Sequence, residues 1–227
     1  SSGSKRSLGW IPFQRQSRQI EKNSITYLGR KFRWFSSCER ELPKNVRDGH
    51  FVEDSRGRWY VCLRVEVPED NQHGNDIVGL DLGIKSLITT SNGEKFENPK
   101  NYKKLEHKLK IAQRANNKQR MRALHAKIAN QRRDFNHKLS TKLIKANQAI
   151  FVGNVSSAKL AKTRMSKSVY DASWAQLRTF LRYKASRHGV KYQEVNEAFT
   201  TQTCSHCGSR PDGRPKGIAG LGIREWV

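Results

Sequence analysis

The chain has 227 residues, which is enough for one large domain or two small ones with a substantial hydrophobic core. Its formal net charge is +24, from 44 Lys and Arg against 20 Asp and Glu, so we expect a polyanionic partner, with nucleic acid ahead of an anionic membrane surface. The sequence holds no run of about 18 apolar residues and no signal peptide, which argues against a membrane protein and predicts a cytoplasmic location.

Short segments of alternating apolar and polar residues occupy the first part of the chain, from about residue 24 to residue 67. This alternation predicts strands, and residues 55–58, Ser-Arg-Gly-Arg, have the composition of a hairpin turn between two of them. The segment PEDNQHGND, residues 68–76, has no periodicity and is typical of a linker. We therefore predict a small β-barrel-like segment over residues 1–72.

Alternating strands and helices are predicted after this boundary. IVGLDLG, residues 77–83, is a near-continuous apolar run, and SLITTSNGEKF, residues 86–96, is a second strand that runs into an Asn-Gly turn. A strand follows at residues 149–155, then an amphipathic helix that ends at Gly189, then a strand at residues 190–196. The order strand, strand, helices, strand, helix, strand predicts an α/β domain.

The helices between residues 100 and 148 are strongly basic. Fourteen Lys and Arg lie between Lys103 and Lys145, against the two acids Glu106 and Asp134, while leucines and other apolar residues recur every three, four or seven positions. A solvated charged face is the ordinary explanation of such a segment, but a bias to one sign favours nucleic-acid binding. The predicted nucleic-acid-binding residues are Lys103, Lys104, Lys108, Arg114, Arg120, Arg132 and Arg133.

Two of the four cysteines form the pair Cys204-x-x-Cys207, which favours metal binding over a disulfide framework. A structural zinc ion takes four ligands, so this pair is half of a site. Cys38 and Cys62 are alternative sources of the other two ligands, although both have the pattern of buried apolar positions.

Three of these segments, in this order and with basic helices between the first two, resemble the RuvC-like nuclease domain of TnpB proteins. They are IVGLDLGIKSLITTSNGE, KSVYDASWAQLRTFLRYKA and TTQTCSHCG. TnpB is the transposon-encoded OrfB family, whose members are often called transposases and are related to type V CRISPR effectors. The resemblance covers residues 76–227, and the β segment before it resembles the end of the wedge domain in that family.

The resemblance implies an RNase H-like (RuvC) domain over residues 73–199 with a basic helical insertion. The first half of a zinc ribbon would follow over residues 200–227. It also implies an RNA-guided DNA endonuclease with two catalytic Mg²⁺ ions, a structural Zn²⁺ on Cys204 and Cys207, and DNA and a guide RNA as partners.

Two-metal hydrolysis of a phosphodiester requires about three converging carboxylates. Asp81 ends a predicted buried strand and is the first candidate. Where the family has a Glu at the end of a later strand, this chain has Gly153-Asn154. Either the site is inactive, or the carboxylate has moved to Glu197 at the end of the next strand, as in Fanzor relatives; Glu194, inside that strand, is the weaker substitute.

The third family carboxylate and the second zinc pair find no counterpart before Val227, because neither Asp212 nor Glu225 matches the family position. Together with a first residue that is not Met, this predicts a fragment that lacks both ends and is inactive as it stands. Two other functions stay open: a nuclease-dead RNA-guided DNA-binding protein, and an accessory nucleic-acid-binding protein of a transposon.

Overall fold

The computed structural model describes residues 9–14, 18–21, 23–35, 45–83, 86–153 and 173–196. The chain divides into two compact units: residues 1–69 with 103–131, and residues 70–102 with 132–227. This division separates the β segment from the α/β sheet close to the predicted linker. It also groups most of the basic helical pair with the first unit.

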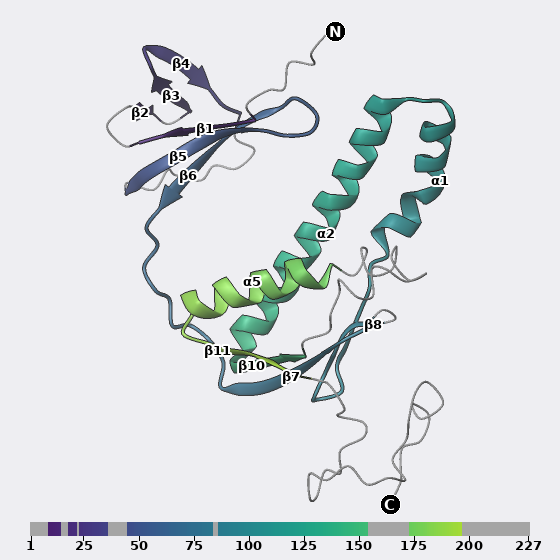
Figure 1. Ribbon diagram of the computed structural model, residues 1–227. Coiled ribbons are helices and arrows are strands. Elements are labelled where there is room, and N and C mark those ends of the chain that lie inside the picture. The colour runs from purple at the N-terminus through teal and green to yellow at the C-terminus, as the bar shows by residue number, and fades with distance from the viewer. Residues whose placement is uncertain are drawn as a thin grey trace, which may run out of the picture. The chain divides into compact units, whose positions relative to one another are not determined.

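The strands of the first unit form two antiparallel three-stranded sheets (Figure 1). One sheet has the order β1-β5-β6, with β1 at Trp10–Phe13, β5 at Val46–Glu53 and β6 at Trp59–Val65. The other has the order β2-β3-β4, at Arg18–Glu21, Ser24–Tyr27 and Arg30–Arg33. The β structure after residue 24 is confirmed, whereas β1 and β2 were not predicted.

The predicted hairpin turn joins β5 to β6 and is organised by Asp54. Its carboxylate accepts hydrogen bonds from the backbone N–H of Arg58 and Arg56 at 3.0 and 2.8 Å, and from the Tyr60 hydroxyl at 3.1 Å. These bonds, led by that from the Arg58 backbone, lower the pKa of Asp54 to about 2.

The core of the first unit consists of Phe13, Ile25 and Phe51, which are buried. Successive residues of a strand point to opposite faces, so Phe13 of β1 and Phe51 of β5 fill the inner face of their sheet. Gly49 of β5 makes room for them, because a Cβ atom there would lie 2.7 Å from the Phe13 ring. The alternate residues of these two strands, among them Trp10 of β1 and His50 of β5, therefore face outward.

Two helices follow, α1 at Asn101–Arg114 and α2 at Lys118–Ala146, and Figure 1 shows them as a helical hairpin. Leu109 and Ala112 of α1 and Leu124 and Ile128 of α2 are buried. Their spacing of three and four residues is that of one helix face, which confirms the predicted helical pair.

The second unit contains a five-stranded sheet of order β11-β10-β7-β8-β9. Its strands are β7 (Asp76–Leu82), β8 (Ser86–Thr90), β9 (Lys95–Glu97), β10 (Asn147–Gly153) and β11 (Lys191–Val195). The first three pair antiparallel, while β10 is parallel to β7 and β11 is parallel to β10. The predicted order of elements is confirmed, with the short β9 added after the Asn-Gly turn.

One face of this sheet is covered by α5 (Trp174–Arg187) and by the last turns of α2 (Figure 1). Buried side chains of the sheet, of both helices and of the segment after α5 form one core there. They are Val78, Leu80, Leu82, Leu87, Ile88, Leu139, Leu143, Ile144, Ile150, Val152, Trp174, Leu177, Leu181, Ala185 and Val190. The mixed α/β fold is thus confirmed. Among the described residues, no helix has both the length and the apolar character that a bilayer crossing requires.

Candidate active site

Asp81 lies near the carboxyl end of β7, the central strand of the five-stranded sheet. Val78, Leu80 and Leu82 are at most 4 % exposed on the helix-covered face. By alternation Asp81 points to the opposite face, where it is exposed. Within the described residues its carboxylate makes no hydrogen bond or ion pair.

The strand register places four residues in one row with Asp81. Thr89 of β8 lies directly opposite Asp81, and Lys95 of β9 lies opposite Thr89. On the other side Val152 pairs with Leu80, so the next residue, Gly153, lies beside Asp81, and Gly153 pairs with Val195 of β11. Paired residues share a sheet face, so Thr89 presents a hydroxyl next to Asp81, and Lys95 presents an ammonium group on the same face one strand farther away.

Thr89 and Lys95 were missed by the sequence analysis, although the signal was present. The Asn-Gly turn fixes the register between β8 and β9 and so pairs Lys95 with Thr89. The pairing of Thr89 with Asp81 depends instead on the short connection from β7 to β8.

Gly153 occupies the position beside Asp81 at which the family resemblance calls for a carboxylate. The glycine is buried and supplies no ligand, so the described sheet offers no acid at this point. Asn154, Glu197, Cys204 and Cys207 lie outside the described residues.

Glu194 faces away from Asp81. It pairs with Val152 on β10, whose neighbour on β7 is the buried Leu80, so its side chain is on the helix-covered face. There its carboxylate lies 2.6 Å from the guanidinium of Arg182 and 3.9 Å from that of Arg178. Since Glu194 is held on the opposite face, it does not serve as a second ligand beside Asp81.

The electrostatic state of Glu194 follows from this pairing. Burial by itself raises the pKa of Glu194, but hydrogen bonds from Arg182 and Tyr192 and the charges of Arg178 and Arg182 outweigh it and lower the pKa below 4.5. The Tyr192 hydroxyl donates to Glu194 at 3.0 Å, and burial together with this bond raises the pKa of Tyr192. The ion pairs of Glu194 therefore connect β11 to α5.

A divalent metal ion fits Asp81 as one of its ligands. Mg²⁺ binds oxygen and is commonly held by one or two carboxylates while it keeps several waters. In the part of the chain that the structure describes, no three His, Cys, Asp or Glu side chains come close enough to hold a metal between them. A metal site with three such ligands would therefore need at least one of them from outside the described residues.

Six of the seven predicted nucleic-acid-binding residues are exposed on α1 and α2, and Arg132 is half-buried. Within the described residues none of these six is in an ion pair. Other cations of the same helices are neutralised: Lys110 pairs with Glu106 at 3.5 Å, Lys138 with Asp134 at 2.7 Å, and Lys142 with Glu94 at 2.6 Å. These six cations thus carry charge that no ion pair within the described residues neutralises.

The sequence matches two family models. Residues 60–164 match OrfB_IS605, described as "Probable transposase", and residues 174–227 match the Cas12f1-like TNB domain. A "Putative RNA-guided DNA endonuclease" of Streptomyces pristinaespiralis is 34 % identical over 205 residues, which cover 83 % of this chain and 50 % of that protein. The chain is a relative of the OrfB/TnpB proteins.

Two further proteins are similar in sequence to this chain. The "Putative RNA-guided DNA endonuclease InsQ" of Escherichia coli K12 is 30 % identical over 218 residues, covering 83 % of this chain and 54 % of InsQ. TnpB-like protein L79 of Acanthamoeba polyphaga mimivirus is 24 % identical, covering 70 % of this chain and 36 % of L79. The chain spans about half the length of the first two of these TnpB relatives.

One solved structure also aligns with part of this chain. A cryo-EM structure of a Cas12f1–sgRNA–target DNA complex aligns with a TM-score of 0.46 at 17 % identity, covering 74 % of this chain and 39 % of Cas12f1.

The ion pairs of Glu194 predict a pH-dependent contribution to stability. Because the pKa of Glu194 is lowered in the folded chain, its contribution is complete above the unfolded value of 4.5 and is lost as the pH falls through the lower folded value. Glu194→Gln should reduce the free energy of unfolding by about 0.5–1 kcal/mol at pH 7. The difference from the wild type should be smaller at pH 3 than at pH 7 in thermal or urea unfolding.

Asp134→Asn is the matched control, because it breaks the pair with Lys138, in which both side chains are more than 60 % exposed. It should change stability little at either pH. An equal effect of the two substitutions at pH 7 would contradict the anchoring role of Glu194.

Proposed function

We propose that the protein is an RNA-guided DNA endonuclease that hydrolyses phosphodiester bonds with the help of bound Mg²⁺. The observation that carries this proposal is Asp81, an exposed carboxylate without a partner among the described residues, near the carboxyl end of the central strand of an α/β sheet. The printed functions of the Streptomyces and Escherichia relatives give the same reaction class. Guide RNA and target DNA are the proposed partners.

The sheet supports an RNase H-like (RuvC) assignment for the second unit. Three antiparallel strands are followed by two parallel strands on the far side of the first, and a helix connects β10 to β11. The basic hairpin of α1 and α2 is inserted between β9 and β10. Ligands of open α/β sheets bind at the carboxyl ends of the strands, where Asp81 lies.

The side chains around Asp81 have separate proposed roles. Asp81 holds the metal through its oxygens, and Glu197, two residues after Val195, supplies the second carboxylate. Lys95 and Thr89 share the face of Asp81 and contact phosphate oxygens of the bound strand, which orients it. When bound, the metal ions would activate the attacking water and stabilise the leaving oxygen.

A nuclease-dead RNA-guided DNA-binding protein is the second candidate function. Gly153 is the specific observation that favours it, since this residue beside Asp81 has no side chain with which to hold a metal. The two functions differ in whether DNA that is bound is also cut.

The first prediction from this proposal concerns Asp81. Asp81→Asn keeps the size of the side chain but removes the charge that holds Mg²⁺, so cleavage should fall at least about 100-fold. The measurement is Mg²⁺-dependent cleavage of target DNA by the full-length protein with its guide, with DNA binding measured in parallel. Binding should persist.

Asp76→Asn is the control, because Asp76 is an exposed carboxylate at the other end of the same strand. It should leave cleavage unchanged. Wild-type protein that binds its target without cutting would establish the nuclease-dead alternative, and cleavage that survives Asp81→Asn would remove Asp81 from the site.

The second prediction concerns the unpaired cations of α1. Replacing Lys103, Lys104 and Lys108 together by Gln should weaken binding to duplex DNA and reduce the slope of log affinity against log salt by about 2–3. A control variant with Gln at Lys110, Lys138 and Lys142 loses the same charge from residues that are already in ion pairs. If the control variant lost as much slope, net charge rather than this surface would govern binding.

The third prediction concerns Cys204 and Cys207, which we propose as two thiolate ligands of a structural zinc ion. Cys204→Ser in the full-length protein should lower its zinc content, measured by elemental mass spectrometry. Cys62→Ser is the control, since Cys62 lies on β6 in the first unit. An equal loss of zinc in the control would instead place Cys62 among the ligands.

A further inference from the structure

The outer face of the β1-β5-β6 sheet carries aromatic side chains that the core does not use. Ile11, Phe13 and Phe51 point inward, so Trp10 of β1 and His50 of β5 point outward. The Trp10 side chain is 54 % exposed, and its ring centroid lies 5.7 Å from that of His50. An outer sheet face is ordinarily polar, so this exposed ring pair suggests a ligand.

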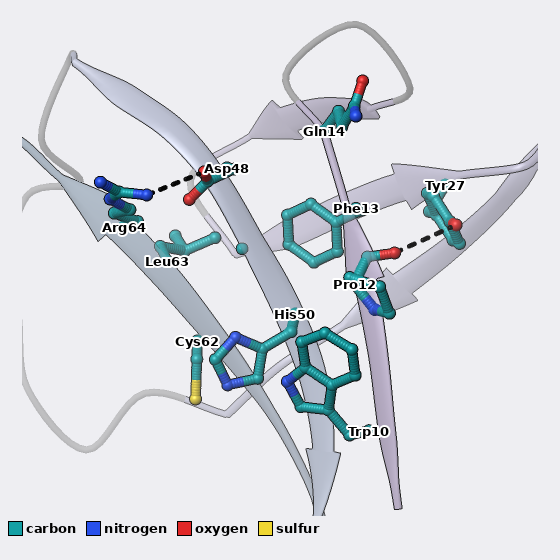
Figure 2. A pocket seen from close by; sticks show the side chains of 11 residues that line it. Trp10, Pro12, Phe13, Gln14, Tyr27, Asp48, His50, Cys62, Leu63 and Arg64 are labelled. Atoms are coloured by element: carbon teal, nitrogen blue, oxygen red, sulfur yellow. Dashed lines mark hydrogen bonds and ion pairs between the residues drawn. The ribbon is translucent and has the colours of Figure 1, made fainter. Parts of the chain in front are cut away.

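A cavity of about 670 Å³ is lined by outward side chains of this sheet and also by Phe13, Leu63 and Tyr27 from its inner side (Figure 2). This volume is in the range of about 300–1,000 Å³ that is typical of small-ligand sites. Trp10 and His50 lie on one side of the cavity, next to the thiol of Cys62, and Asp48 and Arg64 lie on the other. The site thus combines a stacking surface with charged groups.

The charged pair has the chemistry of a nucleotide site. Arg64 lies 3.4 Å from Asp48, and its side chain is 75 % exposed. An exposed ion pair of this kind contributes only about 0–1 kcal/mol, so the guanidinium can turn to a phosphate at little cost. Arg64 therefore supplies the cation that a nucleotide phosphate requires.

Asp48 indicates which nucleic acid the site selects. Its carboxylate repels phosphate but accepts a hydrogen bond from a ribose 2′-hydroxyl, which DNA lacks. Because the Trp10 and His50 rings already lie against each other, a base would stack on the free side of Trp10 rather than between them. We propose that this cavity binds one unpaired nucleotide of single-stranded RNA. Its base lies on Trp10, its 2′-hydroxyl on Asp48 and its phosphate on Arg64.

Cys62 provides a direct test, because its thiol lines the cavity. The full chain is incubated with oligouridine RNA in high salt, which weakens purely electrostatic binding to other surfaces, and is then alkylated with N-ethylmaleimide. Alkylation of the Cys62 peptide is followed by mass spectrometry and compared with the same variant without RNA. RNA should protect Cys62 in the wild type.

Trp10→Ala should raise the RNA concentration needed for half-protection about 5- to 100-fold, whereas Trp10→Phe should stay close to the wild type. Trp59→Ala is the control, since Trp59 is 49 % exposed on the same sheet but does not line the cavity. Absence of protection in the wild type, or equal effects of Trp10→Ala and Trp59→Ala, would overturn the site.

Oligodeoxyuridine DNA of the same length tests the sugar, because it differs from oligouridine only in lacking the 2′-hydroxyl. It should protect Cys62 less than RNA does, and Asp48→Ala should abolish the difference. Equal protection by DNA and RNA in the wild type would overturn the assignment to RNA. None of these measurements involves Asp81 or cleavage, so their failure is separable from failure of the nuclease proposal.

Discussion

The second unit depends on the burial of one face of β7. Val78, Leu80 and Leu82 pack against α2 and α5, and they determine which way the whole strand faces. Because side chains alternate, burying these three residues forces Asp81 onto the open face. A shift of one residue would bury the carboxylate and expose the core, so the hydrophobic contact that stabilises the sheet also presents the candidate ligand.

The helix-covered face is completed by polar contacts that hold α5 in place. Lys184 of α5 donates hydrogen bonds to the Ser140 and Thr141 hydroxyls of α2 at 2.7 Å and to the His137 carbonyl at 2.8 Å, and burial lowers its pKa. Glu194 joins the other side of α5 to β11. Because β11 is held in this way, Val195 stays in the row that contains Asp81. The chain therefore leaves β11 at the level of Asp81.

Most of the fold was predictable because its periodicities are strong, and the exceptions have physical reasons. β1 was missed because WIPF contains Pro12 and has only four residues, and a proline is tolerated there because β1 is an edge strand. The place of Asp81 near the end of a strand was predictable from the apolar run that contains it, whereas its role as a metal ligand rests on the family resemblance and stays a prediction. The pairing of Glu194 with Arg178 and Arg182 was not, because it depends on how α5 packs over β11 rather than on any local pattern.

The charge distribution makes metal and nucleic-acid binding interdependent in the proposed nuclease. An exposed carboxylate repels a phosphate, so Asp81 alone would oppose the approach of DNA along the row that holds Lys95. A divalent cation on Asp81 would reverse that repulsion, and the phosphate oxygens would in turn supply ligands that the described side chains lack. By linkage, each ligand must then raise the affinity for the other by the same factor.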